Sequence, residues 1–128
     1  MRYSKFRNVF TVVDGIKFRS KSEATRYQEL KLLERAGAIS GLKLQVRYPL
    51  NVGGNHITTY VADFTYTEYV HSLQRPQTIY SRFVVEDRKG YRTPDYIIKA
   101  KLMKALYGYE IRETGRTSKR KPILKRAA

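Results

Sequence analysis

The chain has 128 residues, a length that favours one domain with a substantial hydrophobic core. Lys and Arg number 26 against 11 Asp and Glu, so the formal net charge is +15. This excess predicts a polyanionic partner, and nucleic acid is the first expectation. Because Cys is absent, disulfides, thiol catalysis and Cys-ligated zinc are excluded. We find no apolar run that could span a bilayer and no signal-peptide pattern, so we expect a soluble cytoplasmic protein without a membrane partner.

The N-terminal part of the chain predicts a hairpin followed by a helix. An Asp-Gly pair beginning at Asp14 separates two short apolar stretches within residues 10–18, which is a strong signal for a tight turn between two strands. Ser20, with Glu23 three positions later, forms a capping box, and the apolar residues that follow have helical spacing. We therefore expect a helix over residues 21–36.

Three strands are predicted next. Residues 42–50 alternate apolar and polar side chains, as a half-buried strand does. Residues 57–70 are rich in β-branched and aromatic residues, which favours a second, long strand. A polar connection then leads to a third strand over residues 82–88, whose last residues are charged.

The C-terminal part predicts a second helix and a last strand. Thr93 is a suitable N-cap, Pro94 suits the first helical turn, and Gly108 stands where the helix should end. Residues 109–113 follow as a short strand, and a basic segment with little apolar content completes the chain.

This order of elements predicts a single α/β domain over residues 10–113. Its core would run helix, three strands, helix, strand, and a mixed β-sheet would be flanked by the helices, with the hairpin at the N-terminus. Residues 1–9 are expected to form a basic N-terminal arm, and residues 114–128 a flexible basic tail.

Acidic residues inside two of the predicted strands are the best candidates for chemistry. Alternation places Asp87 and Lys89 on one face of the third strand, and Glu86 and Arg88 on the other. Asp63 stands between apolar residues of the preceding strand, where an unpaired carboxylate is costly. Because adjacent strands lie ~4.8 Å apart, two inward carboxylates could bridge one hard cation such as Mg²⁺ (or Mn²⁺).

Asp63 followed by the run from Asp87 to Lys89 resembles the bipartite signature of the PD-(D/E)XK nuclease superfamily. The segment 13–50 is similar to the N-terminal half of a phage- and prophage-encoded family within that superfamily, one related to Holliday-junction resolvases. The resemblance covers most of residues 10–113. It implies a restriction-endonuclease-like fold and metal-dependent hydrolysis of phosphodiester bonds without a covalent enzyme intermediate.

The resemblance also implies residue roles. Glu23 would complete the metal site with Asp63 and Asp87, and the backbone carbonyl of Arg88 would be a further ligand. Lys89 would orient the attacking water or neutralise charge on the phosphate, and Gln45 would lie near the site. The resemblance thus implies catalytic roles for Glu23, Gln45, Asp63, Asp87 and Lys89, and it implies Glu23, Asp63, Asp87 and the Arg88 backbone carbonyl as metal ligands.

Several alternatives stay open. Glu23 is also explained by its capping box, and Asp87 with Lys89 could be a plain surface ion pair. A flipped third strand would direct Glu86 and Arg88 to the site instead, but the lysine in the motif's final position favours Asp87 and Lys89. Arg88 fills a slot that is more often apolar, so we expect it to reach an edge or to pair with Glu86.

Basic residues gather in three groups that we expect to contact DNA phosphates. The groups lie around the start of the first helix, on the second helix and in the tail. They are Lys17, Arg19 and Lys21; Lys99, Lys101 and Lys104; and Arg116, Lys119, Arg120 and Lys121.

Two functions compete. The first is a Mg²⁺-dependent DNA endonuclease selective for branched DNA such as a Holliday junction, acting as a homodimer in the cytoplasm of a bacterial host and encoded by a phage. The alternative is a non-catalytic basic nucleic-acid-binding protein, which explains the charge equally well but not the acids inside apolar strands. A membrane-surface protein is disfavoured, because no basic helix has a large apolar face.

Overall fold

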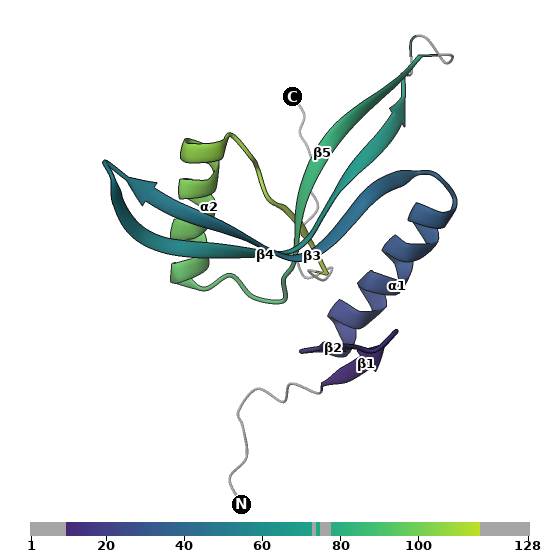
Figure 1. Ribbon diagram of the computed structural model, residues 1–128, viewed down its shortest axis with the longest axis horizontal. Helices are drawn as coiled ribbons and strands as arrows, with labels where there is room; N and C mark the ends of the chain where they lie inside the picture. Colours follow the sequence, from purple (N-terminus) through teal and green to yellow (C-terminus); the bar gives the residue numbers. More distant parts are fainter. Residues whose placement is uncertain (1–9, 73, 75–77, 116–128) are drawn as a thin grey trace, which may run out of the picture.

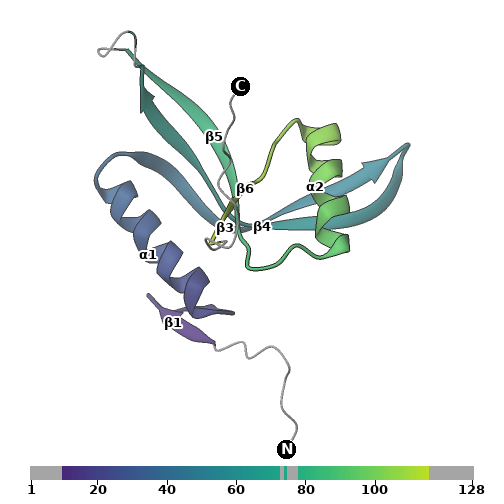
Figure 2. The same ribbon diagram turned by 180° about the vertical axis from the view of Figure 1, so that it is seen from behind.

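The computed structural model describes residues 10–72, 74 and 78–115 (Figures 1 and 2). The elements are β1 (Thr11–Val13), β2 (Ile16–Phe18), α1 (Lys21–Arg35), β3 (Ile39–Val52), β4 (Asn55–His71), β5 (Ile79–Arg88), α2 (Pro94–Tyr107) and β6 (Arg112–Thr114). An N-terminal hairpin is followed by helix, three strands, helix and strand, so the predicted mixed α/β architecture is confirmed. The predicted basic arm 1–9 lies outside the described residues, as does most of the predicted tail 114–128. The predicted start of the tail is wrong, because Thr114 belongs to β6.

The main sheet has the strand order β3-β4-β5-β6. Its first two pairs are antiparallel, while β5 and β6 run parallel. β5 pairs with β4 only from Phe64 onward, so the hairpin formed by residues 46–62 extends beyond the end of β5. We call this hairpin the β3–β4 arm. In Figure 1 it diverges from the β4–β5 hairpin on the other side of the sheet centre.

The two helices cover opposite faces of the sheet. α1 packs Ala24, Tyr27 and Leu30 into one apolar cluster, whereas α2 packs Tyr96 and Met103 into another. The consecutive residues Val84 and Val85 of β5 belong to the first and the second cluster respectively. Since successive side chains of a strand point to opposite faces, β5 separates two small cores, and its charged C-terminal end is flanked by both helices.

The predicted helices form at the expected places because their caps form. Ser20 Oγ accepts a hydrogen bond from the Glu23 N–H at 3.1 Å at the start of α1, and Thr93 Oγ1 accepts one from the Tyr96 N–H at 3.1 Å at the start of α2. Gly108 ends α2 with φ +78°, a left-handed conformation that favours glycine. No helix of the described residues is long and apolar enough to cross a membrane.

The strands differ from the prediction in their limits. β3 begins at Ile39 rather than at residue 42, because a bulge at Gly41, with φ +66°, lets its pairing with β4 continue. The predicted strand 109–113 is wrong in its bounds, since β6 is Arg112–Thr114. Tyr109 and Ile111 instead pack against the α2-side core, and the chain reaches the edge of β5 only after them.

Candidate active site

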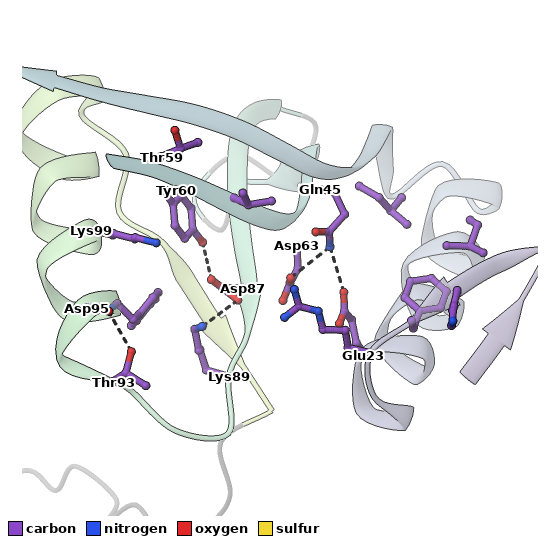
Figure 3. A pocket seen from close by; sticks show the side chains of 17 residues that line it. Glu23, Gln45, Thr59, Tyr60, Asp63, Asp87, Lys89, Thr93, Asp95 and Lys99 are labelled. Atoms are coloured by element: carbon purple, nitrogen blue, oxygen red, sulfur yellow. Dashed lines mark hydrogen bonds and ion pairs between the residues drawn. The ribbon is translucent and has the colours of Figure 1, made fainter. Parts of the chain in front are cut away.

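A cavity of about 600 Å³ opens between the start of α1, the base of the β3–β4 arm, the end of β5 and the first turns of α2 (Figure 3). The five side chains that the sequence singled out as catalytic all line this cavity. They are Glu23, Gln45, Asp63, Asp87 and Lys89. The fold thus brings together side chains from α1, β3, β4, β5 and the residue that follows β5, spread over more than half the chain.

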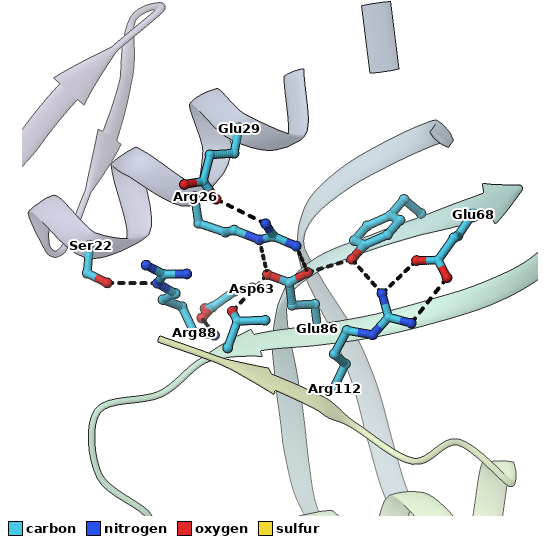
Figure 4. Close-up of polar contacts among 10 residues, drawn as sticks. Ser22, Arg26, Glu29, Asp63, Glu68, Glu86, Arg88 and Arg112 are labelled. Atoms are coloured by element: carbon cyan, nitrogen blue, oxygen red, sulfur yellow. Dashed lines mark hydrogen bonds and ion pairs between the residues drawn. The ribbon is translucent and has the colours of Figure 1, made fainter. Parts of the chain in front are cut away.

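The register of β5 is the one expected from alternation. Asp87 and Lys89 line the cavity, and Lys89 Nζ lies 3.6 Å from Asp87 Oδ1. Glu86 points to the opposite face, where its fully buried carboxylate accepts a hydrogen bond from Arg26 Nε at 2.6 Å (Figure 4). The expected alternative of an Arg88–Glu86 pair is therefore wrong. Arg88 reaches the start of α1 and donates from Nε to Ser22 Oγ at 2.8 Å.

Asp63 and Asp87 form a carboxylate pair across the neighbouring strands β4 and β5. Burial, the nearby charge of Asp63 and a hydrogen bond with Asp63 together raise the pKa of Asp87 from its ordinary value of 3.8 to about 7. Burial also raises the pKa of Asp63. The Arg88 N–H donates to Asp63 Oδ2 at 2.9 Å, which fixes this carboxylate. Two such groups share a proton readily, because ionising both without a cation is costly.

Glu23 takes part in the cap and in the site with different atoms. Its backbone N–H donates to the cap residue, while its carboxylate Oε2 accepts from Gln45 Nε2 at 3.2 Å. Gln45 Nε2 is also 3.5 Å from Asp63 Oδ1, so one amide links both acids. Among the described residues, the reciprocal half of the capping box is not formed. Burial raises the pKa of Glu23, while the charge of Arg19 opposes this shift.

Gln45 has an unusual backbone conformation for its residue type. Its φ of +54° lies in the left-handed region, which costs a non-glycine residue about 1 kcal/mol or more. The surrounding pairs Leu44–Phe64 and Val46–Ala62 keep the strand in register on both sides. The strain is therefore local, and it accompanies the placement of the amide between Glu23 and Asp63.

Two tyrosines support the site and were not singled out by the sequence. The Tyr60 hydroxyl donates to Asp87 Oδ2 at 2.6 Å, and the ring of Tyr96 lies 4.3 Å from Lys89 Nζ. Both tyrosines are buried, and Tyr96 is anchored in turn by its hydroxyl on Glu113 Oε2 at 2.8 Å. In a chain with 11 tyrosines, no local pattern distinguishes these two from the others.

The donor atoms suit a hard divalent cation, but the three acids are not gathered around one point. In the part of the chain that the structure describes, no group of three or more Asp, Glu or His side chains could hold a metal ion as arranged. Asp63 and Asp87 are close together, whereas the Glu23 carboxylate is engaged by Gln45. Oxygen ligands of this kind are those that Mg²⁺ prefers, and one or two protein carboxylates suffice when waters and phosphate complete the shell.

Of the described basic residues predicted to contact DNA, three line the cavity. Lys17 and Arg19 come from β2 and the turn after it, and Lys99 comes from α2. Lys21 does not line it, and Lys101 and Lys104 border a second hollow on α2, where Lys104 pairs with Glu110. The remaining predicted contacts, Arg116, Lys119, Arg120 and Lys121, lie outside the described residues.

Comparison with known proteins places the chain in a family but gives it no activity. The chain belongs to the family described as "Protein of unknown function (DUF1064)", which matches residues 3–121. No curated protein and no solved structure matches the chain. The description of the family names no substrate or reaction, so the function has to be argued from the cavity and its side chains.

Proposed function

We propose that this DUF1064 chain is a Mg²⁺- or Mn²⁺-dependent endonuclease that hydrolyses phosphodiester bonds in DNA. The observation that carries the proposal is the carboxylate pair of the half-buried Asp63 and the buried Asp87, with the Lys89 ammonium beside it, in a cavity of about 600 Å³. The match between these residues and the PD-(D/E)XK signature supports the same reaction.

Each residue has a definite task in this proposal. Asp63 and Asp87, with Glu23 and the Arg88 carbonyl, would hold the cation, which when bound lowers the pKa of a water and offsets phosphate charge. Lys89 is positioned between Asp87 and the Tyr96 ring, so its ammonium can stabilise negative charge that develops on the phosphate. The Gln45 amide holds the Glu23 carboxylate beside Asp63.

The choice of DNA as substrate rests on charge. The net charge of +15 predicts a polyanion, and Lys17, Arg19 and Lys99 place cations on two sides of the carboxylates. We extend the proposal to branched DNA such as a four-way junction, cut by a homodimer, because two symmetric cuts require two matched sites. Action on DNA in the cytoplasm of a bacterial host is part of the same proposal.

One observation favours the non-catalytic alternative, a basic protein that binds nucleic acid without cutting it. Within the described ranges, three acids are not arranged to hold one ion. A protein that only binds phosphate, however, gains nothing from placing Asp63 and Asp87 side by side in its cavity, since both repel phosphate. The carboxylate pair therefore favours the endonuclease.

The test is cleavage of labelled DNA by the full chain. Four-way junction, flap and linear duplex are incubated with Mg²⁺, with Mn²⁺ or with EDTA, beside Asp87→Asn and Lys89→Ala. The matched control is Asp95→Asn, which removes an acid that lines the same cavity but has no proposed role as a ligand. We expect metal-dependent cutting that falls at least about 100-fold in the first two variants and persists in the control. Tight binding without cutting in either metal would contradict the endonuclease and support the alternative.

A further inference from the structure

The β3–β4 arm has one covered face and one open face. Its covered face packs Leu50, Tyr60 and Ala62 against α2. The opposite face of the hairpin carries six residues that are exposed or half-buried. They form three pairs across the two strands. These open-face residues are Arg47, Pro49, Asn51, His56, Thr59 and Val61.

The open face is continuous with the candidate active site. Thr59 and Val61 line the same cavity as Asp63, which follows them on β4. Their partners across the hairpin are Pro49 and Arg47. Moving outward along the arm from the carboxylates, a bound molecule would therefore meet this face without leaving the protein surface.

The open face carries the positive charge of Arg47 and no acidic side chain. No Asp or Glu occurs in the sequence between Glu34 and Asp63. Arg47 is exposed and has no ion-pair partner among the residues that the structure describes. The exposed Arg82 of the β4–β5 hairpin differs, because it pairs with Glu68 at 2.8 Å.

Three polar side chains near the tip of the arm are fixed relative to one another. His56 Nδ1 lies 2.8 Å from Asn51 Oδ1, and His56 Nε2 lies 3.3 Å from Thr59 Oγ1. The tight turn that carries them uses Gly53 and Gly54, with φ of +57° and +81°. The His56 ring is therefore held by a contact at each of its two nitrogens.

We propose that the open face of the β3–β4 arm binds the major groove of a DNA duplex that adjoins the cleaved phosphate. The proposal rests on the proposed endonuclease function and adds the class of substrate, namely DNA with a duplex on the side of the arm. A two-stranded ribbon fits a groove of about 12 Å width. At ~3.3 Å per residue, residues 55–62 span roughly 25 Å, or about seven base-pair steps. Arg47 contacts phosphate, and the fixed polar side chains face base edges.

The experiment measures DNA binding in EDTA, so that it does not depend on cleavage. Fluorescence anisotropy compares a short labelled duplex with a single strand of the same sequence, over a range of salt concentrations. The variants of the full chain are Arg47→Ala/His56→Ala, Arg47→Glu and the matched control Arg82→Ala. All three positions are exposed, and unchanged thermal unfolding verifies that the variants are folded.

The double variant is expected to bind duplex roughly 10-fold more weakly, with a salt slope reduced by about 1, and to change single-strand binding by less than about 2-fold. Arg47→Glu should weaken duplex binding further, and Arg82→Ala should leave it unchanged. Equal losses for duplex and single strand, a loss no greater than in the control, or a wild-type chain that does not bind duplex would overturn the inference. If the wild-type chain is a dimer and the double variant is a monomer, the open face is an interface between two copies of the chain and the inference fails.

The two proposals fail in different ways. If the wild-type chain binds duplex through Arg47 but cuts no DNA, the duplex-binding role of the arm stands and the endonuclease proposal fails. If the chain cuts DNA and the double variant keeps full affinity for duplex, the endonuclease proposal stands and the duplex-binding role of the arm fails.

Discussion

The hydroxyl of Tyr60 donates a hydrogen bond of 2.6 Å to Asp87 Oδ2, and both side chains are almost completely buried. The bond stabilises the ionised form of Asp87 and so acts to lower its pKa, against burial and the charge of Asp63, which raise it. Tyr60 comes from β4 and Asp87 from β5, so the contact ties the carboxylate pair to the base of the β3–β4 arm. Tyr60 is thus a positioning residue for Asp87.

Replacement of Tyr60 by Phe should impair cutting by making Asp87 harder to ionise. Loss of the hydroxyl raises the pKa of Asp87 further, so the pH at which cutting reaches half its maximum should move upward. At neutral pH we expect a decrease of about 10-fold, since a hydrogen bond to a charged group contributes roughly 1.5 kcal/mol. The measurement is a pH–rate profile of junction cleavage. Tyr107→Phe is the control, because that hydroxyl donates to the Pro49 carbonyl, and a shift of the same size there would contradict the assigned role.

The ring of Tyr96 should matter more for cutting than its hydroxyl does. Tyr96→Leu removes the ring that lies 4.3 Å from Lys89 Nζ, whereas Tyr96→Phe keeps the ring and loses only the bond to Glu113. A cation–π contact contributes roughly 1–2 kcal/mol, so kcat should fall about 5- to 30-fold in the leucine variant with KM unchanged. Steady-state kinetics on a cleavable junction measures both. Equal effects of the two substitutions would show that the ring does not position Lys89.

The contacts of these two tyrosines could not be predicted from the sequence, whereas the grouping of the charged residues could. Asp63, Asp87 and Lys89 were placed together because strand alternation and adjacent strands determine which side chains share a face. The contacts of Tyr60 and Tyr96 depend on the twist of the sheet and on how α2 packs, which no local pattern contains. For the same reason, the pairing of Arg88 with Ser22 could not be predicted.

The prediction of the elements had a similar limit. Caps and glycines defined the ends of α1 and α2 closely, because they are local signals. The start of β6 depends instead on tertiary packing, since Tyr109 and Ile111 pack against the core before pairing begins. Glu23 has one contact that a local signal predicts and one that depends on tertiary packing. Its backbone serves the cap that the sequence predicted, and its carboxylate turns to Gln45 across the cavity.

The buried Glu86 should make stability depend on pH below about 5. Burial acts to raise the pKa of Glu86, but hydrogen bonds from Arg26, Tyr66 and Thr114 outweigh it and hold the pKa below its ordinary value of 4.5. The stabilisation by the ionised carboxylate is therefore present above pH 4.5 and is lost as the pH falls through the lower value of the folded state. Urea unfolding at pH 3 to 6 should show this decrease, and Glu86→Gln should flatten it.

The same substitution should destabilise the protein at neutral pH. Glu86→Gln breaks a buried ion pair with Arg26, and such a loss costs about 3 kcal/mol of unfolding free energy. Glu29→Gln is the matched control, because Glu29 pairs with the same arginine at 3.0 Å from an exposed position, where the cost is within about 1 kcal/mol. Equal losses in the two variants would mean that burial of Glu86 does not govern its contribution.

In the proposed endonuclease, Asp63 and Asp87 share a proton that a divalent cation replaces. The direct measurement is calorimetric titration of Mn²⁺ into the full chain at pH 6 and pH 8, in two buffers of different ionisation enthalpy so that proton release is counted. Because the pKa of Asp87 is raised to about 7, we predict tighter binding at pH 8, with proton release at pH 6, and loss of both in Asp87→Asn but not in Asp95→Asn. Binding that is absent at both pH values, or unchanged in Asp87→Asn, would contradict the account.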